Sequence, residues 1–382
     1  MRGPMARPIV IAAGGTGGHL FPAEALAAEL TARGERVALM TDARSAAFES
    51  PAFGAAERFV LRGSGLAGRG VRRAAAGVAA LAAGTLEARA ILSRINAAAV
   101  VGFGGYPSVP PLLAARTLPR GRRPVTVLHE QNAVLGRANR LLSRGADLLA
   151  LSFSDTQRVP PGVTAEVVGN PVRPALAALV GQGYATPGDD GALRLLVTGG
   201  SLGARVLADV VPAAVAALPE AIRARLLVTQ QTRTDDLPRV AAAYKAAGIP
   251  AELSPFFGDM AVRLGTAHLV IARAGASTVA ELACAGRPSI LVPLPHAIDD
   301  HQTANARSLE SAGAAWVMPQ PVFLAEALSA RLGALLADGP GLARAAAATT
   351  SLARPDAARR LADLVLHLVA RRAPEPAHAE FR

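Results

Sequence analysis

Four glycines and a histidine follow the first apolar segment of the chain, and this combination suits phosphate chemistry. Ile9–Ile11 leads into GGTGG at residues 14–18, and His19 comes next. Glycines leave backbone N–H groups free to approach an anion, and the start of a helix adds its positive dipole end. An imidazole with an ordinary pKa near ~6.5 suits a general base at neutral pH. The alternative is a histidine that only satisfies the helix start.

A small-residue turn, ARAGASTVAELACAG at residues 272–286, opens a second helix of this kind. Its N-terminus suits a diphosphate. Glu281 has two interpretations, because it is either a ligand acceptor or the second member of the capping box Thr278-x-x-Glu281. Spacing alone does not separate them.

The polar segment PLPHAIDDHQTAN, residues 293–305, follows an expected strand. Open α/β sheets place ligand contacts in such loops. Its histidines and aspartates make metal ligation one interpretation, and a solvated loop is the other. The chain contains no Asp-x-Asp pair, which argues against a metal bridge on a diphosphate.

The glycine loops do not fit the common nucleotide fingerprints. Leu20 occupies the third glycine position of the first loop, and GGSLGA at 199–204 lacks the initial G-x-G of a dinucleotide site. Asp42, at the end of the second expected strand, does resemble the ribose-binding acid of that fingerprint. No G-x-x-x-x-G-K-[ST] segment occurs, so a P-loop nucleotidase is also disfavoured.

The composition indicates two domains in a reducing compartment. A chain of 382 residues with 51% apolar residues suits two domains, which implies a cleft between them. Cys284 is the only cysteine, so we expect no intrachain disulfide and a cytoplasmic location. The formal net charge of +11 indicates an anionic partner. Nucleic acid is disfavoured because aromatic residues are few and the basic residues are scattered.

Apolar segments alternate with helical segments along the chain, which predicts an α/β fold of two doubly wound parallel sheets. The strands expected in the first half are Ile9–Ile11, Arg36–Thr41, Arg58–Leu61, Ala98–Phe103, Pro124–His129, Asp147–Leu151 and Ala165–Val168. Those expected in the second half are Leu193–Thr198, Ala224–Thr229, Ala251–Ser254, His268–Ala272, Ser289–Val292 and Ala315–Met318.

We expect an N-terminal domain over residues 7–175 and a C-terminal domain over 192–350. The segment 181–191, GQGYATPGDDG, has the composition of a linker. An amphipathic last helix, 355–371, is expected to pack back on the N-terminal domain, and residues 373–382 are expected to be disordered.

Basic residues surround an apolar helical segment between Arg62 and Arg94, as in a surface that binds a membrane interface. The residues expected to contact the membrane are Arg69, Arg72, Arg73, Val78 and Leu81. The alternative is a core helix with ordinary flanking charges. The uncharged segment ends at Glu87, so we expect no membrane-spanning helix, and the N-terminus does not resemble a signal peptide.

Seven motifs, in order, give the chain a specific resemblance: GGTGGH, GFGGYPS, HEQN, VVGNPVR, GGSLGAR, RAGASTVAEL and DDHQTANA. Over nearly its whole length the chain resembles the MurG family of bacterial peptidoglycan glycosyltransferases. Members move N-acetylglucosamine from UDP-N-acetylglucosamine to the muramoyl-pentapeptide diphospho-undecaprenol lipid. The resemblance implies a two-domain GT-B fold, an inverting mechanism and peripheral attachment to the cytoplasmic face of the cell membrane.

The resemblance also implies a role for each matching residue. His19 would be the catalytic base, Glu281 would accept the ribose hydroxyls, and Phe257 would contact uracil through its backbone. Phe257 stands where an aliphatic residue is expected, and Leu202 stands where glutamine is common. The donor-binding positions would be Thr16, Gly17, Gly18, Asn132, Arg173, Ser201, Phe257, Ala276, Ser277, Thr278, Val279, Ala280, Glu281 and Gln302.

The donor would bind the C-terminal domain and the lipid-linked acceptor the N-terminal domain. The resemblance implies no tightly bound cofactor and no metal site, and leaves room for stimulation by a divalent cation. Expected partners are UDP-N-acetylglucosamine, the lipid-linked acceptor and anionic membrane lipids. Other cell-wall synthesis proteins are possible partners, and nucleic acid is not an expected one. The alternatives are another GT-B sugar transferase, a UDP-N-acetylglucosamine epimerase and a non-catalytic membrane scaffold.

Overall fold

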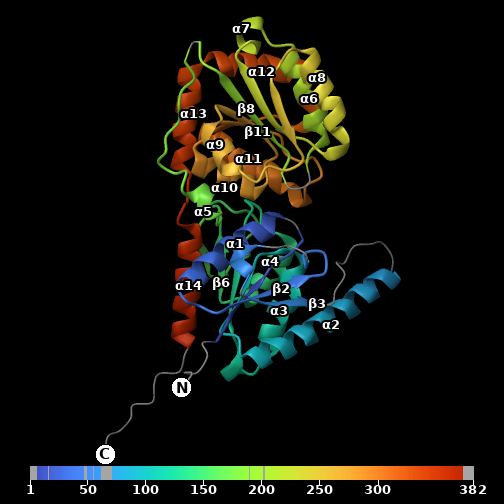
Figure 1. Cartoon of the computed structure of the whole chain (residues 1–382). Coiled ribbons are helices and arrows are strands. Elements are labelled where there is room, and N and C mark those ends of the chain that lie inside the picture. The colour runs from blue at the N-terminus through green and yellow to red at the C-terminus, as the bar shows by residue number, and fades with distance from the viewer. Residues whose placement is uncertain are drawn as a thin grey trace, which may run out of the picture. The chain divides into compact units, whose positions relative to one another are not determined.

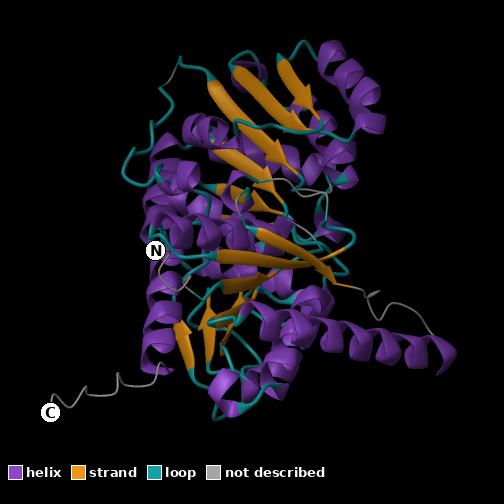
Figure 2. Ribbon diagram, turned by 60° about the horizontal axis from the view of Figure 1, so that its bottom comes forward, coloured by secondary structure: helices purple, strands orange, loops and turns teal. Residues whose placement is uncertain are grey.

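The computed structural model describes residues 7–15, 17–46, 50–54, 56–61, 71–188, 190–200 and 203–372, with the backbone alone at 71–74. The chain folds as two compact units. The first unit contains the segment up to Gln131, Leu135–Pro171 and the segment from Asp356; the second contains Asn132–Val134 and Val172–Pro355. Each unit has its own parallel sheet with helices packed against it (Figures 1 and 2), which confirms the predicted fold class.

The first sheet has seven parallel strands in the order β3-β2-β1-β4-β5-β6-β7. The strands are β1 (Ile9–Ala12), β2 (Val37–Asp42), β3 (Glu57–Leu61), β4 (Ala99–Gly102), β5 (Val125–Glu130), β6 (Leu148–Leu151) and β7 (Ala165–Val167). The helices of this unit are α1 (Gly17–Ala32), α2 (Val71–Ile95), α3 (Gly105–Thr117), α4 (Arg137–Leu142) and α14 (Ala357–Arg372).

Strand β1 lies in the middle of this sheet, and its alternating residues face two hydrophobic cores. Ile9 pairs with Val37 of β2 on one side and with Ala99 of β4 on the other. Ile11 packs with residues of α1 and α14, whereas Val10 packs with residues of α2 and α3 on the opposite face. The apolar run of β1 is therefore buried on both faces, as in other parallel sheets.

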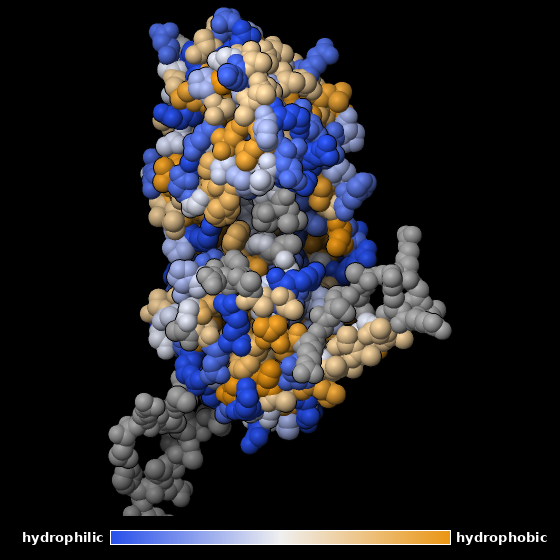
Figure 3. Space-filling model, turned by 45° about the vertical axis from the view of Figure 1, so that its right-hand side comes forward, coloured by the Kyte–Doolittle hydropathy of each residue, from blue (hydrophilic) through white to orange (hydrophobic). Residues whose placement is uncertain are grey.

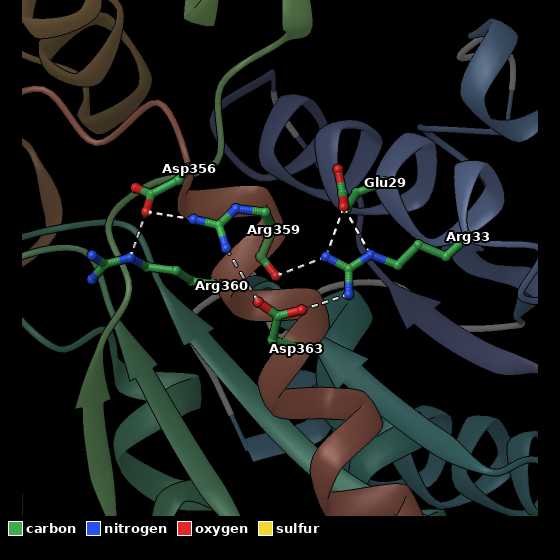
Figure 4. Close-up of polar contacts among 6 residues, drawn as sticks. All are labelled: Glu29, Arg33, Asp356, Arg359, Arg360 and Asp363. Carbon is green, nitrogen blue, oxygen red and sulfur yellow. Dashed lines mark hydrogen bonds and ion pairs between the residues drawn. The ribbon is translucent and has the colours of Figure 1, made fainter.

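Helix α14, the last described element, packs on α1 of the first unit, and a group of charged side chains lines this contact (Figure 4). Arg33, directly after α1, forms ion pairs with Asp363 at 2.6 Å and with Glu29 at 2.7 Å. These partly exposed pairs contribute at most about 1 kcal/mol each. Leu361 and Val365 are fully buried beneath them, and each contributes roughly 1.5–3 kcal/mol, so apolar burial holds the helix in place.

The second sheet has six parallel strands in the order β10-β9-β8-β11-β12-β13. The strands are β8 (Leu193–Thr198), β9 (Leu226–Gln231), β10 (Ala251–Ser254), β11 (Leu269–Ala272), β12 (Ser289–Leu291) and β13 (Ala315–Val317). The helices are α5 (Pro174–Ala177), α6 (Arg205–Ala216), α7 (Glu220–Arg223), α8 (Leu237–Ala246), α9 (Met260–Thr266), α10 (Ala276–Ala285), α11 (His301–Ser311), α12 (Ala325–Ala337) and α13 (Gly339–Ser351).

The sequence predicts that the segment 181–191 links the two domains. In the structure the chain enters the second unit earlier, at Val172, so this segment belongs to that unit. The buried guanidinium of Arg287 donates hydrogen bonds to the carbonyl of Gly183 and lies 5.4 Å from the ring centre of Tyr184. Burial raises the pKa of Tyr184 to about 12. These contacts hold a glycine-rich segment against the second unit. Residues 373–382, expected to be disordered, lie outside the described residues.

Helix α2 is longer than the uncharged segment from which it was predicted, because it continues past Glu87 to Ile95. Figures 1 and 2 show its first turns extending away from the sheet of its own unit. By length and composition alone, the 21 residues Ala75–Ile95 would suffice to cross a membrane. The C-terminal half is anchored in the protein, however, because Ala88 and Leu92 are buried in the core beside α3.

Candidate active site

The first glycine loop connects β1 to α1 and places His19 in the first turn of that helix. Gly17 and Gly18 are the first two helical residues, and His19 is half-buried. Gly15 has a φ of 92°, a conformation that favours glycine, and its N–H donates to the Ser45 hydroxyl at 2.7 Å. Thr16 lies outside the described residues. Pro22 lies inside this helix, one turn after its start.

A second glycine turn, at the end of β4, lies against the ring of His19. Gly104 and Gly105 have φ values of 80° and 67°. A Cβ atom at Gly105 would lie 3.5 Å from Nε2 of His19, and one at Gly104 would lie 3.5 Å from Cε1. The buried Ser108 hydroxyl donates to the carbonyls of Ala12 and Gly104, which holds the turn in place. The absence of two side chains leaves room beside Nε2.

The four polar residues HEQN at the end of β5 all form hydrogen bonds. His129 Nε2 donates to the carbonyl of Gly169 at 3.0 Å, and burial lowers the pKa of His129 to about 4. Glu130 accepts hydrogen bonds from Asn139 and from the backbone of Gly136. Gln131 Oε1 lies 3.0 Å from Nδ1 of His19.

The last residue of this segment, Asn132, belongs to the second unit. Its Oδ1 accepts a hydrogen bond at 3.1 Å from Asn305, a fully buried residue of α11. Asn305 also donates to the carbonyl of Ala274 and accepts from the N–H of Ala133. Gln302, one turn earlier in α11, accepts from the N–H of Leu294. Asn132 is therefore held by α11, and Gln302, itself in α11, holds the segment after β12.

Arg173 and Glu281, which are 108 residues apart in the sequence, are neighbours in the second unit. Arg173 lies just before α5 and Glu281 lies within α10, with 3.5 Å between Nη2 and Oε1. The Glu281 side chain is 15% exposed. Burial raises the pKa of Glu281, while the charge and hydrogen bond of Arg173 oppose that rise. The pair places a carboxylate and a guanidinium beside α10.

Helix α10 contains the run of predicted donor-binding residues. Glu281 is not part of a capping box, because the helix starts at Ala276 after Gly275 and Thr278 is therefore inside it. The Ser277 hydroxyl is buried and has no hydrogen-bond partner among the described residues, as expected of a group that awaits a ligand. The residues that share the first turns of this helix are Ala276, Ser277, Thr278, Val279, Ala280 and Glu281.

The glycine loop after β8 has a cationic neighbour that the sequence analysis did not identify. Arg233 follows β9, and its Cγ lies 2.7 Å from where a Cβ would be on Gly203, whose φ is 68°. Within the described part of the chain, the exposed Arg233 guanidinium has no hydrogen bond or ion pair. It is thus available to an anion at this loop. Ser201 and Leu202 lie outside the described residues.

The loop after β10 holds Phe257, whose side chain is only 6% exposed. The guanidinium of Arg263 lies 4.0 Å from its ring centre and forms ion pairs with Glu252 and Asp259. The cation–π contact with Arg263 holds the Phe257 ring in place, and this fixes the neighbouring backbone. Arg273, also absent from the sequence prediction, donates to the Val292 and Pro293 carbonyls and ties two strand ends together.

The predicted membrane-binding residues divide between surface and core. Val78 is 63% exposed and Leu86, which was not predicted, is 67% exposed. Leu81 is half-buried and packs against the core of the first unit, so the core interpretation holds in part for this residue. Figure 3 shows apolar side chains along the projecting helix. Arg69 and the side chains of Arg72 and Arg73 lie outside the described residues.

The chain resembles known proteins over nearly its whole length. Residues 9–150 match the glycosyltransferase family 28 N-terminal domain, and residues 194–361 match the C-terminal domain of that family. A Granulibacter bethesdensis protein is 59% identical over 94% of this chain and 93% of its own length. It is named UDP-N-acetylglucosamine–N-acetylmuramyl-(pentapeptide) pyrophosphoryl-undecaprenol N-acetylglucosamine transferase. A Rhodospirillum centenum protein of the same name is 56% identical over 94% of each chain.

Solved structures extend the comparison. The crystal structure of Acinetobacter baumannii MurG matches with a TM-score of 0.76 and 30% identity, over 94% of this chain and 99% of that one. A putative UDP-N-acetylglucosamine 2-epimerase from Listeria monocytogenes matches with a TM-score of 0.65 over 97% of this chain and 98% of its own. At 16% identity, that second match shows a shared fold only.

Proposed function

The chain belongs to the MurG family within glycosyltransferase family 28, and on this basis we propose the reaction that it performs. It moves N-acetylglucosamine from UDP-N-acetylglucosamine to undecaprenyl-diphospho-N-acetylmuramoyl-pentapeptide in peptidoglycan synthesis. The observation that carries the mechanism is the position of His19. Its Nδ1 is hydrogen-bonded to Gln131, and its Nε2 lies beside two glycines.

In the proposed mechanism His19 is the general base that deprotonates the acceptor hydroxyl. Nε2 of His19 takes the proton of the acceptor hydroxyl as its oxygen attacks the anomeric carbon of the donor. The bond from that carbon to the diphosphate breaks, and UDP leaves with the electron pair. A single displacement inverts the anomeric configuration and needs no covalent intermediate. A positioned general base contributes about 10²–10⁴-fold to such a step.

The donor binds the second unit in this proposal. Glu281 accepts the ribose hydroxyls, and Arg173, 3.5 Å away, favours its ionised form. The buried Ser277 hydroxyl and the N-terminus of α10 face the diphosphate, with Arg233 at the neighbouring glycine loop. These groups stabilise the charge that develops on UDP. We also propose that no cofactor is tightly bound and that a divalent cation stimulates the reaction.

We further propose that α2 carries the enzyme to the cytoplasmic face of the cell membrane as a peripheral protein. Its exposed residues from Ala75 to Leu86 are only alanine, valine and leucine. Arg89 and Arg94 follow on the same helix, where they suit anionic headgroups. The C-terminal half of α2 is anchored by the buried Ala88 and Leu92, which favours surface attachment over a span.

The test is a transfer assay with the full-length chain, UDP-N-acetylglucosamine and the lipid-linked acceptor. The proposal expects labelled sugar in the lipid product, with inverted configuration, and UDP release that depends on the acceptor. An epimerase would instead change the donor sugar with no acceptor present. A non-catalytic scaffold would bind UDP and produce neither.

A further inference from the structure

A chain of three hydrogen bonds runs from His19 into the core of the first unit. Nδ1 of His19 lies 3.0 Å from Oε1 of Gln131. Nε2 of Gln131 lies 2.9 Å from Nδ1 of His129, and Nε2 of His129 lies 3.0 Å from the carbonyl oxygen of Gly169. Gln131 and His129 are 1% and 0% exposed, so no water competes for these bonds.

The donor and the acceptor of each hydrogen bond can be assigned by starting from the carbonyl of Gly169, at the end of the chain. A carbonyl oxygen only accepts, so Nε2 of His129 must carry a hydrogen. His129 is neutral at physiological pH, because burial lowers its pKa to about 4, and its Nδ1 is therefore an acceptor. The Gln131 amide nitrogen donates to that Nδ1 and to the His129 carbonyl at 3.1 Å.

The opposite orientation of the Gln131 amide is excluded by the same contacts. A flipped amide would place its oxygen against two acceptors, Nδ1 and the carbonyl of His129, and would leave both unsatisfied in the core. Oε1 of Gln131 therefore faces His19. Since an amide oxygen only accepts, Nδ1 of His19 must carry the hydrogen.

We propose that Gln131 and His129 are positioning residues that hold His19 in the Nδ1–H tautomer, so that its lone pair is on Nε2 beside Gly104 and Gly105. Free histidine favours the opposite, Nε2–H tautomer, in which that nitrogen is no base. The proposal rests on the proposed function of His19. When Nε2 takes the hydroxyl proton, Nδ1 keeps its own, so the hydrogen bond to Gln131 persists through the step.

The tautomer can be measured without turnover. The full-length protein is labelled with [¹⁵N]histidine, and the two ring nitrogens of His19 are observed at a pH well above the usual imidazole pKa of ~6.5. The difference from a His19→Gln sample assigns the signals among the seven histidines. We expect a protonated Nδ1 and an unprotonated Nε2. A protonated Nε2 in the wild-type protein would overturn the proposal, and this result needs no variant beyond the assignment.

The second part tests whether Gln131 is the cause. Gln131→Met keeps the length of the side chain and removes its three hydrogen bonds, so His19 should revert to mainly Nε2–H. In the proposed reaction kcat should fall by at least about tenfold, toward the ~10⁴-fold loss known for a base in the wrong tautomer, while the donor KM stays unchanged. The matched control is Gln230→Met, a buried glutamine of the second unit that accepts from Tyr244. It should leave the His19 tautomer unchanged.

Persistence of Nδ1–H in Gln131→Met would show that Gln131 does not hold the tautomer. A normal kcat with a reverted tautomer would show that the tautomer does not matter for the reaction. If Gln131→Met does not fold, His129→Phe removes the same bond to the Gln131 amide from the other side. A wild-type protein with the expected tautomer but full turnover in His19→Gln would refute the base assignment and leave the hydrogen-bond chain intact, so the two failures are distinguishable.

Discussion

Replacing Glu281 by glutamine tests the donor half of the site with almost no change in shape. Glu281 lies in α10 with 15% of its side chain exposed, 3.5 Å from Arg173. If its carboxylate accepts the ribose hydroxyls, the variant loses hydrogen bonds to a charged group, which contribute roughly 1.5–3 kcal/mol. At about 1.4 kcal/mol per tenfold, the donor KM and the Kd of UDP should both rise between about ten- and 150-fold.

The variant also removes an ion pair, so its effect on folding must be separated from its effect on binding. Arg173 keeps 31% of its side chain exposed, and water can solvate the guanidinium in part. We therefore expect a small change in melting temperature. Glu220→Gln is the matched control, because it breaks a Glu–Arg pair on α7 of the same unit, with 76% of the carboxylate side chain exposed.

Titration calorimetry with UDP gives Kd, and acceptor-dependent UDP release gives the donor KM. A Glu281→Gln protein that melts like the wild type and binds UDP within roughly twofold of it, under 0.5 kcal/mol, would refute the assignment of Glu281 to the ribose. An equal loss of affinity in Glu220→Gln would attribute the effect to general destabilisation instead.

Three further outcomes follow from the structure. Asp363→Asn should lower the free energy of unfolding by at most about 1 kcal/mol in urea titrations, with the difference shrinking at high salt, because its partner Arg33 is partly exposed; an increase in stability would contradict the ion pair. The pKa of His129 is about 4 in the folded protein, below its unfolded value, so the unfolded chain binds the extra proton as pH falls. The wild type should lose about 2 kcal/mol of stability more than His129→Phe between pH 7 and 5, and equal slopes would refute the neutral, buried imidazole. Val78→Glu and Leu86→Glu should each bind anionic vesicles more weakly in co-sedimentation, because both side chains are exposed on α2. Unchanged binding by both variants would show that α2 does not contact the membrane.

The strands of both sheets were predictable because their signal is local. Central strands such as β1, β4, β6 and β11 are short apolar runs followed by glycine or polar residues, and burial on both faces of a parallel sheet favours that composition. Errors in their ends are small: β5, expected at Pro124–His129, is Val125–Glu130. The glycine loop before α1 was predictable for the same reason.

The contacts that make the site were not predictable from one sequence, because they join distant residues. Gln131 meets His19 across 112 positions, and Arg173 meets Glu281 across 108. The role of Glu281 stayed open at the sequence level because Thr278-x-x-Glu281 has capping-box spacing, and only the start of α10 at Ala276 excludes it. The segment 181–191 was predicted to be a linker from its composition, because its contacts to residues far along the chain, such as Arg225 and Arg287, leave no local signal.

The base assignment of His19 is the central claim, and one comparison tests it most directly. His19→Gln and the exposed-histidine control His367→Gln are assayed for kcat at saturating donor and acceptor, and for the Kd of UDP. We expect kcat of His19→Gln to fall about 10²–10⁴-fold, the range for a positioned general base, with the Kd of UDP unchanged and with normal values for the control. A folded His19→Gln protein with near-normal kcat would contradict the account.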